Sequence, residues 1–167
     1  MSEVKRLAKN VNIGVCDVFF YPQGQSIPVA LGLSKGGITV TYTAEYHEIT
    51  TDQTGNMPLD DILIGETIQA EGDILDTSLA KIKALMPTAT AEGSDDNPQS
   101  VTFGSRPGLR TIDCAGKFVF KPIAANQDGS RDLIIHNGAN TGGLELSFKL
   151  DDEWKIHVNI KGYYDDT

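Results

Sequence analysis

The sequence of 167 residues contains few cysteines, few aromatic residues and no long apolar run. Its two cysteines, Cys16 and Cys114, lack the CxxC spacing and cannot build a disulfide framework, so they are expected to be buried free thiols. No run of about 20 apolar residues is present that could cross a membrane. No apolar run of signal-peptide length follows the first residues. These absences predict a chain that is made in the cytosol and does not bind a membrane.

Positive charge is missing from one long stretch, because neither lysine nor arginine occurs between Lys35 and Lys81. This stretch carries nine carboxylates, as many as the formal net negative charge of the whole chain, −9. Binding of nucleic acid through its phosphates needs clustered cations, so the acidic balance opposes it. Five cations nevertheless form a basic patch, which consists of Arg106, Arg110, Lys117, Lys121 and Arg131. The acidic and basic surfaces either face solvent separately or meet across a subunit boundary in a self-associating ring.

Motifs that carry catalysis or bind metals are missing as well. The three histidines are scattered, and no HExxH, GxSxG, phosphate-loop or dinucleotide pattern occurs. The adjacent carboxylates of Asp60 and Asp61, and of Asp151 and Asp152, fit solvated turns better than the acid pair of a glycosidase. We therefore expect no enzymatic activity, no metal and no other cofactor.

Residues that favour β-strands, broken into short runs by 17 glycines, predict a mainly β fold in one domain, residues 1–167. Segments 15–21 and 29–33 are expected to form a first hairpin. Regular alternation then predicts two long strands at 38–50 and 63–74, joined by an extended loop at 51–62. The polar residues of the two strands would share one face, which would make a two-stranded acidic surface.

A short helix is expected after the second long strand, capped by Asp76 or Thr77 and ended by Pro87. Residues 88–99 are small and polar and predict an exposed loop. The glycine-rich run 137–143 predicts a loop or a wide hairpin. Further strands are expected at 100–103, 111–122, 132–136, 144–150 and 154–163. In the last of these, Trp154, Ile156, Val158 and Ile160 would form one apolar row.

The order of features between residues 36 and 87 is informative. The first long strand ends in YHEITTDQTG at 46–55, a Pro-Leu-Asp loop follows, Gly65, Glu66 and Thr67 open the second strand, and the helix comes next. This order of strand, Asp-Gln-x-Gly loop, long strand with an early Gly-Glu, and helix resembles the major tail tube proteins of tailed bacteriophages. The later strands are of the type expected for this family, but they contain no specific motif.

The resemblance implies an antiparallel β-sandwich or barrel with one short flanking α-helix, a tail-tube-like fold. Hexameric rings of such subunits stack into a hollow tube through which the DNA genome passes without specific binding. Double-stranded DNA carries one negative charge per ~1.7 Å of helix axis. Acidic walls would therefore repel it and let it slide. Candidate lumen-facing residues on the polar strand face are Thr43, Glu45, Gln69, Glu71 and Asp73. A polar face that is merely solvated is the alternative.

Contacts between subunits or rings are implied for the loop at 51–62 and for the basic patch. These candidates are Asp52, Gln53, Pro58, Leu59, Asp60, Asp61, Arg106, Arg110, Lys117 and Lys121. The N-terminal arm, residues 1–13, would add Val4, Leu7 and Val11, unless it is a frayed end. The resemblance also implies a virion protein that is assembled in the host cytoplasm. Its further partners would be the sheath, tape-measure, baseplate and tail-terminator proteins.

Other classes of function remain open. The inner tubes of secretion machines and contractile injection systems share the tail-tube architecture. A carbohydrate-binding β-sandwich would also fit the strands, with Trp154, Tyr163 and Tyr164 as an aromatic platform. A β-rich hydrolase is disfavoured, because no nucleophile and base can be paired from the sequence.

Overall fold

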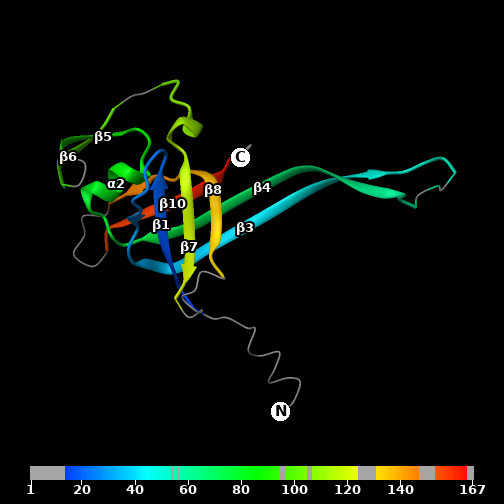
Figure 1. The fold of residues 1–167 in the computed structure, drawn as a ribbon, viewed down its shortest axis with the longest axis horizontal. Coiled ribbons are helices and arrows are strands. Elements are labelled where there is room, and N and C mark those ends of the chain that lie inside the picture. Colours follow the sequence, from blue (N-terminus) through cyan, green and yellow to red (C-terminus); the bar gives the residue numbers. More distant parts are fainter. Residues whose placement is uncertain are drawn as a thin grey trace, which may run out of the picture.

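The computed structural model describes residues 14–53, 55, 57–94, 97–104, 107–123, 131–146 and 153–164. Within these residues the chain is mainly β, as the sequence predicts, with two antiparallel sheets and one short α-helix (Figure 1). The expected N-terminal arm, with Val4, Leu7 and Val11, lies outside the described residues. Arg106 and the turn at 150–152 lie outside them as well.

The larger sheet has eight strands, in the order β2-β1-β7-β8-β10-β4-β3, and β9 pairs with β10. Their bounds are β1 (Cys16–Pro22), β2 (Val29–Ala30), β3 (Ser34–Ile49), β4 (Asp60–Ile74), β7 (Gly116–Pro122), β8 (Leu133–Asn140), β9 (Leu144–Glu145) and β10 (Lys155–Gly162). The predicted first hairpin is confirmed, because β1 and β2 pair antiparallel. The predicted pairing of the two long strands is confirmed by the register of β3 and β4.

The core lies on one face of this sheet, with β10 near its centre. Ile156, Val158 and Ile160 of β10 are fully buried, as their alternation predicts. Trp154, which was predicted to continue this row, precedes the strand and is 45% exposed. The core face is covered by helix α2 (Leu79–Leu85) and by the hairpin of β5 (Ala89–Ser94) and β6 (Asn97–Phe103), which contribute to the same hydrophobic cluster.

Helix α2 confirms the predicted helix, but it begins differently. Ser78 is the N-cap residue and makes no side-chain cap bond. Asp76, a predicted cap, instead accepts a hydrogen bond from the backbone N–H of Ser78 (3.2 Å) and forms an ion pair with Lys81. The side chain of Asp76 therefore links the turn before the helix to the N-cap residue Ser78 and to Lys81 in the first turn of α2.

A single buried amide fixes the other end of the helix to the sheet. The Nδ2 of Asn140 donates to the carbonyl of Leu85 at 3.2 Å. Its Oδ1 accepts from the backbone N–H groups of Gly142 and Asn159, each at 2.9 Å. Because a buried polar group must be hydrogen-bonded, this side chain joins α2, β8 and β10 at one point.

Several predicted segments were wrong. Residues 88–99, predicted as an exposed loop, contribute β5 and the start of β6, because small side chains such as the buried Ala89 pack under the sheet. The strand predicted from Thr111 begins only at Gly116, since Thr111–Cys114 forms a 3-10 helix. β8 continues through the first half of the glycine-rich run. The thiols of Cys16 and Cys114 are free but half-buried rather than buried.

Candidate functional site: the β3–β4 hairpin

Strands β3 and β4 form a long hairpin whose outer part projects from the body (Figure 1). On its second side β4 pairs with β10 only from Gln69 to Ile74. Beyond these residues the hairpin is a two-stranded ribbon, which we call the outer arm, residues 42–68. An isolated ribbon of two strands is only marginally stable in water. The two strands of the outer arm therefore contribute little stability by themselves.

Large apolar side chains lie exposed along the outer arm. Tyr42 pairs with Ile68, and Tyr46 with Leu63, so these residues share the face that continues the core face of the sheet. Tyr42 and Tyr46 are 58% and 61% exposed. Leu63 is 44% exposed. Other exposed apolar side chains of the arm and its tip are those of Met57, Leu59, Ile64 and Ile62, and Ile62 pairs with His47 on the opposite face. Tyr42, Tyr46 and Leu63 therefore form an exposed apolar row on one face of the arm, and exposed apolar surface of this kind is typical of interaction sites.

Two irregularities in register shape the hairpin. Gly36 and Gly37 have φ angles of +76° and +84° and form an insertion between the pair of Lys35 with Asp73 and the pair of Ile38 with Gly72. Ile64 has no partner in the register of β3, which makes a β-bulge in β4. The alternation of β4 shifts by one residue at this bulge. Regular alternation along the strand would place Ile64 on the same face as Ile68, but after the bulge Leu63 takes this place.

The candidate lumen-facing residues share the sheet face opposite the core. Thr43 pairs with Thr67, and Glu45 with Gly65, whereas Gln69, Glu71 and Asp73 alternate along β4. Gln69 Nε2 donates to Glu71 Oε1 at 2.6 Å and to Asn159 Oδ1 at 2.9 Å. The structure thus gathers all five predicted residues on one polar face.

Strand β10 adds side chains that the sequence reasoning did not bring to this face. Asp73 Oδ1 lies 2.8 Å from Nδ1 of His157, and Asp73 Oδ2 accepts from Lys155 Nζ at 3.2 Å. The hydrogen bond to His157, assisted by Lys155, holds the pKa of Asp73 below its ordinary value. Lys161 lies opposite Gln69 on the same face. The cations of β10 therefore partly neutralise the negative charge of the predicted acidic surface.

The predicted contact residues of the acidic loop lie at the hairpin tip. Asp52, Gln53, Pro58 and Leu59 belong to the turn itself. Asp60 and Asp61 were also predicted in the loop, but they pair in β4 with Ile49 and Glu48 because the strand begins three residues earlier than expected. These six residues continue the ribbon outward from the body. Thr54 and Asn56 of the same loop lie outside the described residues.

The described part of the basic patch lies elsewhere on the sheet. Lys117 and Lys121 belong to β7, and β8 and β10 separate this strand from β4. Lys117 Nζ lies 4.5 Å from the ring centroid of Tyr21, and Lys121 Nζ lies 5.4 Å from that of Phe19. Lys121 also forms an ion pair with Asp132 at 3.8 Å. Arg110 precedes the 3-10 helix. Within one chain, the tip and β7 therefore belong to different parts of the sheet.

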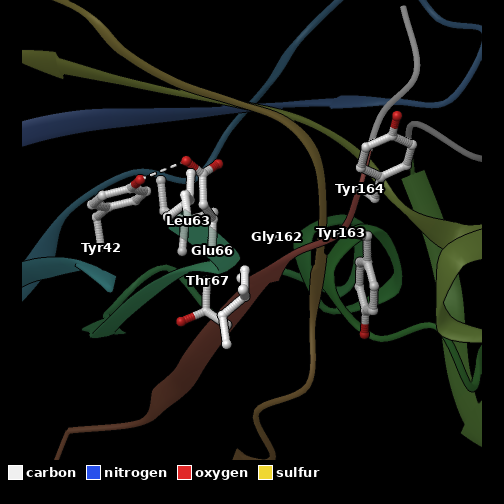
Figure 2. Close-up of a pocket in the computed structure, with 10 residues that line it drawn as sticks. Tyr42, Leu63, Glu66, Thr67, Gly162, Tyr163 and Tyr164 are labelled. Atoms are coloured by element: carbon white, nitrogen blue, oxygen red, sulfur yellow. Dashed lines mark hydrogen bonds between the residues drawn. The ribbon is translucent and has the colours of Figure 1, made fainter. Parts of the chain in front are cut away.

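A hollow of about 590 Å³ lies at the base of the outer arm (Figure 2). It is lined by Tyr42 and residues 63–68 of β4 on one side and by Gly162, Tyr163 and Tyr164 on the other. Tyr42 Oη donates to Glu66 Oε1 at 2.8 Å, and this hydrogen bond to a carboxylate raises the pKa of Tyr42. No role could be assigned to Glu66 from the sequence, because its partner Tyr42 lies 24 residues away along the chain.

The aromatic platform expected for a carbohydrate-binding module does not form. Trp154 precedes the first residue of β10, whereas Tyr163 and Tyr164 follow its last residue. The eight-residue strand therefore separates them. No helix among the described residues is long and apolar enough to cross a membrane. Comparison of the chain with known protein families and with curated proteins finds no match.

Proposed function

We propose that this chain is a structural virion protein that polymerises as stacked hexameric rings into the hollow tail tube of a bacteriophage. The observation that carries the proposal is the outer arm, which extends from the body and exposes Tyr42, Tyr46 and Leu63 along one face. In an isolated subunit these apolar side chains contact water, so they do not stabilise the fold. In a tube, neighbouring subunits bury them, and the hydrophobic effect then drives assembly.

The edges of the sheet support self-association. β3 pairs only with β4 among the described residues, so its second edge of up to sixteen residues is unpaired. At the opposite end, β2 covers β1 only at Phe19 and Phe20. Unpaired strand edges favour pairing with another chain. Pairing of β3 with the β1 end of the next subunit would continue the sheet around a ring and remove both edges.

The polar face supports the assignment of a lumen wall. Its outer part presents Thr39, Thr41, Thr43 and Glu45, and no lysine or arginine occurs between residues 36 and 80. Tight binding of DNA requires several cations that neutralise phosphates. Of the β10 cations on this face, Lys155 pairs with Asp73 and Lys161 lies opposite Gln69. A face with these two cations and with Glu45, Glu71 and Asp73 would let duplex DNA pass without holding it.

Two substitutions in the outer arm test this function. Tyr46→Ser with Leu63→Ser removes apolar surface from the face that we propose to be buried on assembly, and His47→Ser changes a residue on the opposite face as the matched control. Sedimentation velocity should show large assemblies for the wild type and the control but mainly single subunits for the double variant. Unchanged assembly of the double variant, with folding verified by circular dichroism, would contradict the role of the arm.

A further inference from the structure

Strands β4 and β10 diverge at the base of the outer arm. Their pairing ends at Gln69 of β4. The chain that follows β10 bonds to β8 instead, because the N–H of Tyr163 donates to the carbonyl of Asn137 at 2.7 Å and Asn137 Nδ2 donates to the carbonyl of Tyr164 at 3.2 Å. From residue 60 to residue 68, no strand of the described residues pairs with the β10 side of β4. We call this part of the strand the free edge of β4.

Backbone groups of Glu66 point outward from the free edge. In β10, the N–H of Asn159 is bonded on the side of β8, where it donates to Asn140 Oδ1 at 2.9 Å. The backbone groups of successive residues in a strand point to opposite sides, so those of Ile160 point to its partner Ala70 in β4. Two steps of two residues along β4 then lead to Glu66, whose N–H and C=O point to the same side, beyond the last pair with β10.

The hollow of about 590 Å³ lies beside this edge. Its lining combines Tyr42, Glu66 and Ile68 of the hairpin with Tyr163 and Tyr164, which stand on the other side of the hollow in Figure 2. A peptide that is added to a free edge gains affinity from main-chain hydrogen bonds and specificity from pockets for alternate side chains. Tyrosine rings and Ile68 offer contacts to apolar side chains, and the carboxylate of Glu66 offers a partner to a cation.

Charge determines which strand can bind at this edge. The outer arm contains no lysine or arginine, but it carries six carboxylates, those of Glu45, Glu48, Asp52, Asp60, Asp61 and Glu66. Like charges directly opposite each other in a strand pair are destabilising, whereas opposite charges are favourable. A second outer arm would therefore be repelled. A segment with lysine or arginine opposite Glu66 would be attracted.

We propose that the free edge of β4 binds an extended basic segment of a different protein as an added strand. The residue opposite Glu66 is a lysine or arginine, and the residues two positions before and after it are apolar and contact Ile68 and the tyrosine rings. The N-terminal residues of the chain itself do not fit this pattern, because Val4, Leu7 and Val11 are three and four residues apart rather than two. The inference does not rest on the proposed tube, whose rings use the edge of β3.

Binding of a synthetic peptide to the full-length protein tests the proposal. The probe is the fluorescently labelled peptide Thr-Val-Thr-Lys-Thr-Val-Thr, which places a cation between two apolar residues on one face of a strand. The control peptide carries glutamate in place of the lysine. Fluorescence anisotropy should show saturable binding of the lysine peptide and about fivefold weaker binding of the glutamate peptide. Equal affinities, or no saturable binding of the lysine peptide, would overturn the proposal.

Two exchanges of charge locate the site on the arm. Glu66→Lys should reverse the preference, so that the glutamate peptide binds more tightly than the lysine peptide. Glu45→Lys makes the same change of charge on the opposite face of the arm and should leave the preference for lysine in place. Reversal by both variants would show attraction to the general charge of the arm and would overturn recognition at Glu66.

A comparison at the same position tests the addition of a strand. Glu66→Gln and Glu66→Pro both remove the carboxylate, but only proline removes the backbone N–H, and proline is tolerated at an edge. With folding verified by circular dichroism, Glu66→Pro should bind the lysine peptide more weakly than Glu66→Gln. Equal binding by the two variants would contradict main-chain pairing with β4.

Two further measurements distinguish the other possible occupants of the edge. If a chain without residues 1–13 binds the lysine peptide at least tenfold more tightly than the full chain, the N-terminal segment occupies the edge and the proposal is wrong. If the apparent affinity of the full chain falls as its concentration rises, a second copy competes for the edge, which would also overturn the proposal. Affinities that depend on neither change support a partner of a different kind.

Discussion

Asp73 of β4 and His157 of β10 lie directly opposite each other, with Oδ1 and Nδ1 2.8 Å apart. Lys155, two residues before His157, binds the second oxygen of the same carboxylate. Further along the two strands, the side chains of Gln69 and Asn159 are hydrogen-bonded at 2.9 Å. Side chains on the polar face therefore tie β4 to β10, the strand that holds the base of the hairpin to the body.

Stability should depend on pH through Asp73. The pKa of its folded carboxyl lies below the ordinary value of 3.8, so near that pH the folded chain binds fewer protons than the unfolded chain. The stabilisation is fully present above the ordinary pKa and is lost as pH falls through the folded pKa. In urea denaturation, Asp73→Asn should therefore lower the free energy of unfolding at neutral pH, and its difference from the wild type should shrink below pH about 4.

Asp52→Asn, which changes an exposed carboxyl at the hairpin tip, serves as the control for this pH dependence. Its stability should follow that of the wild type throughout. If the difference in unfolding free energy between Asp73→Asn and the wild type stays constant over the whole pH range, this result contradicts the role of Asp73.

The core and the outer arm should respond differently to the same substitution. Ile156 is fully buried in β10, and Ile156→Ala should lower the free energy of unfolding by about 2–5 kcal/mol. Ile62 is half exposed on the arm, so Ile62→Ala should cost less than about 1 kcal/mol in the dissociated chain. Chemical denaturation of dilute protein measures both values. Equal losses would contradict the division into a packed body and an uncovered arm.

Two adjacent glycines offer a test of the packing between β8 and β10. A Cβ on Gly142 would lie 2.4 Å from the carbonyl oxygen of His157, whereas a Cβ on Gly143 would have nothing within 4 Å. Gly142→Ala should therefore destabilise the chain by about 1–3 kcal/mol, because the backbone must shift. Gly143→Ala should be close to neutral. Thermal unfolding of the two variants checks this order, and the reverse order would refute the close approach.

Cations introduced on the polar face should make the proposed tube retain DNA. Thr41→Lys with Thr43→Lys adds two positive charges per subunit on this face. It leaves the hydrogen bonds of Asp73 to β10 in place. Assembled tubes of this variant should retain labelled duplex DNA at low salt and release it as salt increases. Wild-type tubes and a Thr41→Gln with Thr43→Gln control should retain little. Equal retention by all three would contradict a lumen on this face.

Alternation of residue types was sufficient to predict the strands that have one apolar face. Ile156, Val158 and Ile160, and the pairing of β3 with β4, follow directly from this pattern. Alternation was misleading where the backbone inserts a residue, as at Ile64, because the register changes without any change in composition. It also missed β5, whose small residues give no strong apolar signal.

Features that depend on the order of strands could not be read from the sequence. The pattern of β10 places Lys155 and His157 on a polar face, but only the sheet order puts that face beside Asp73. The hollow around Glu66 combines Tyr42 with Tyr163, which are far apart along the chain. Contacts of this kind arise from packing rather than from local pattern, so the site was only partly predictable.

Electron microscopy of the purified full-length protein tests the central claim most directly. The account predicts hollow tubes of stacked rings, with sixfold symmetry in views along the tube axis and with the outer arm of each subunit against a neighbour. Images that show only separate single subunits, even in concentrated protein, would contradict it.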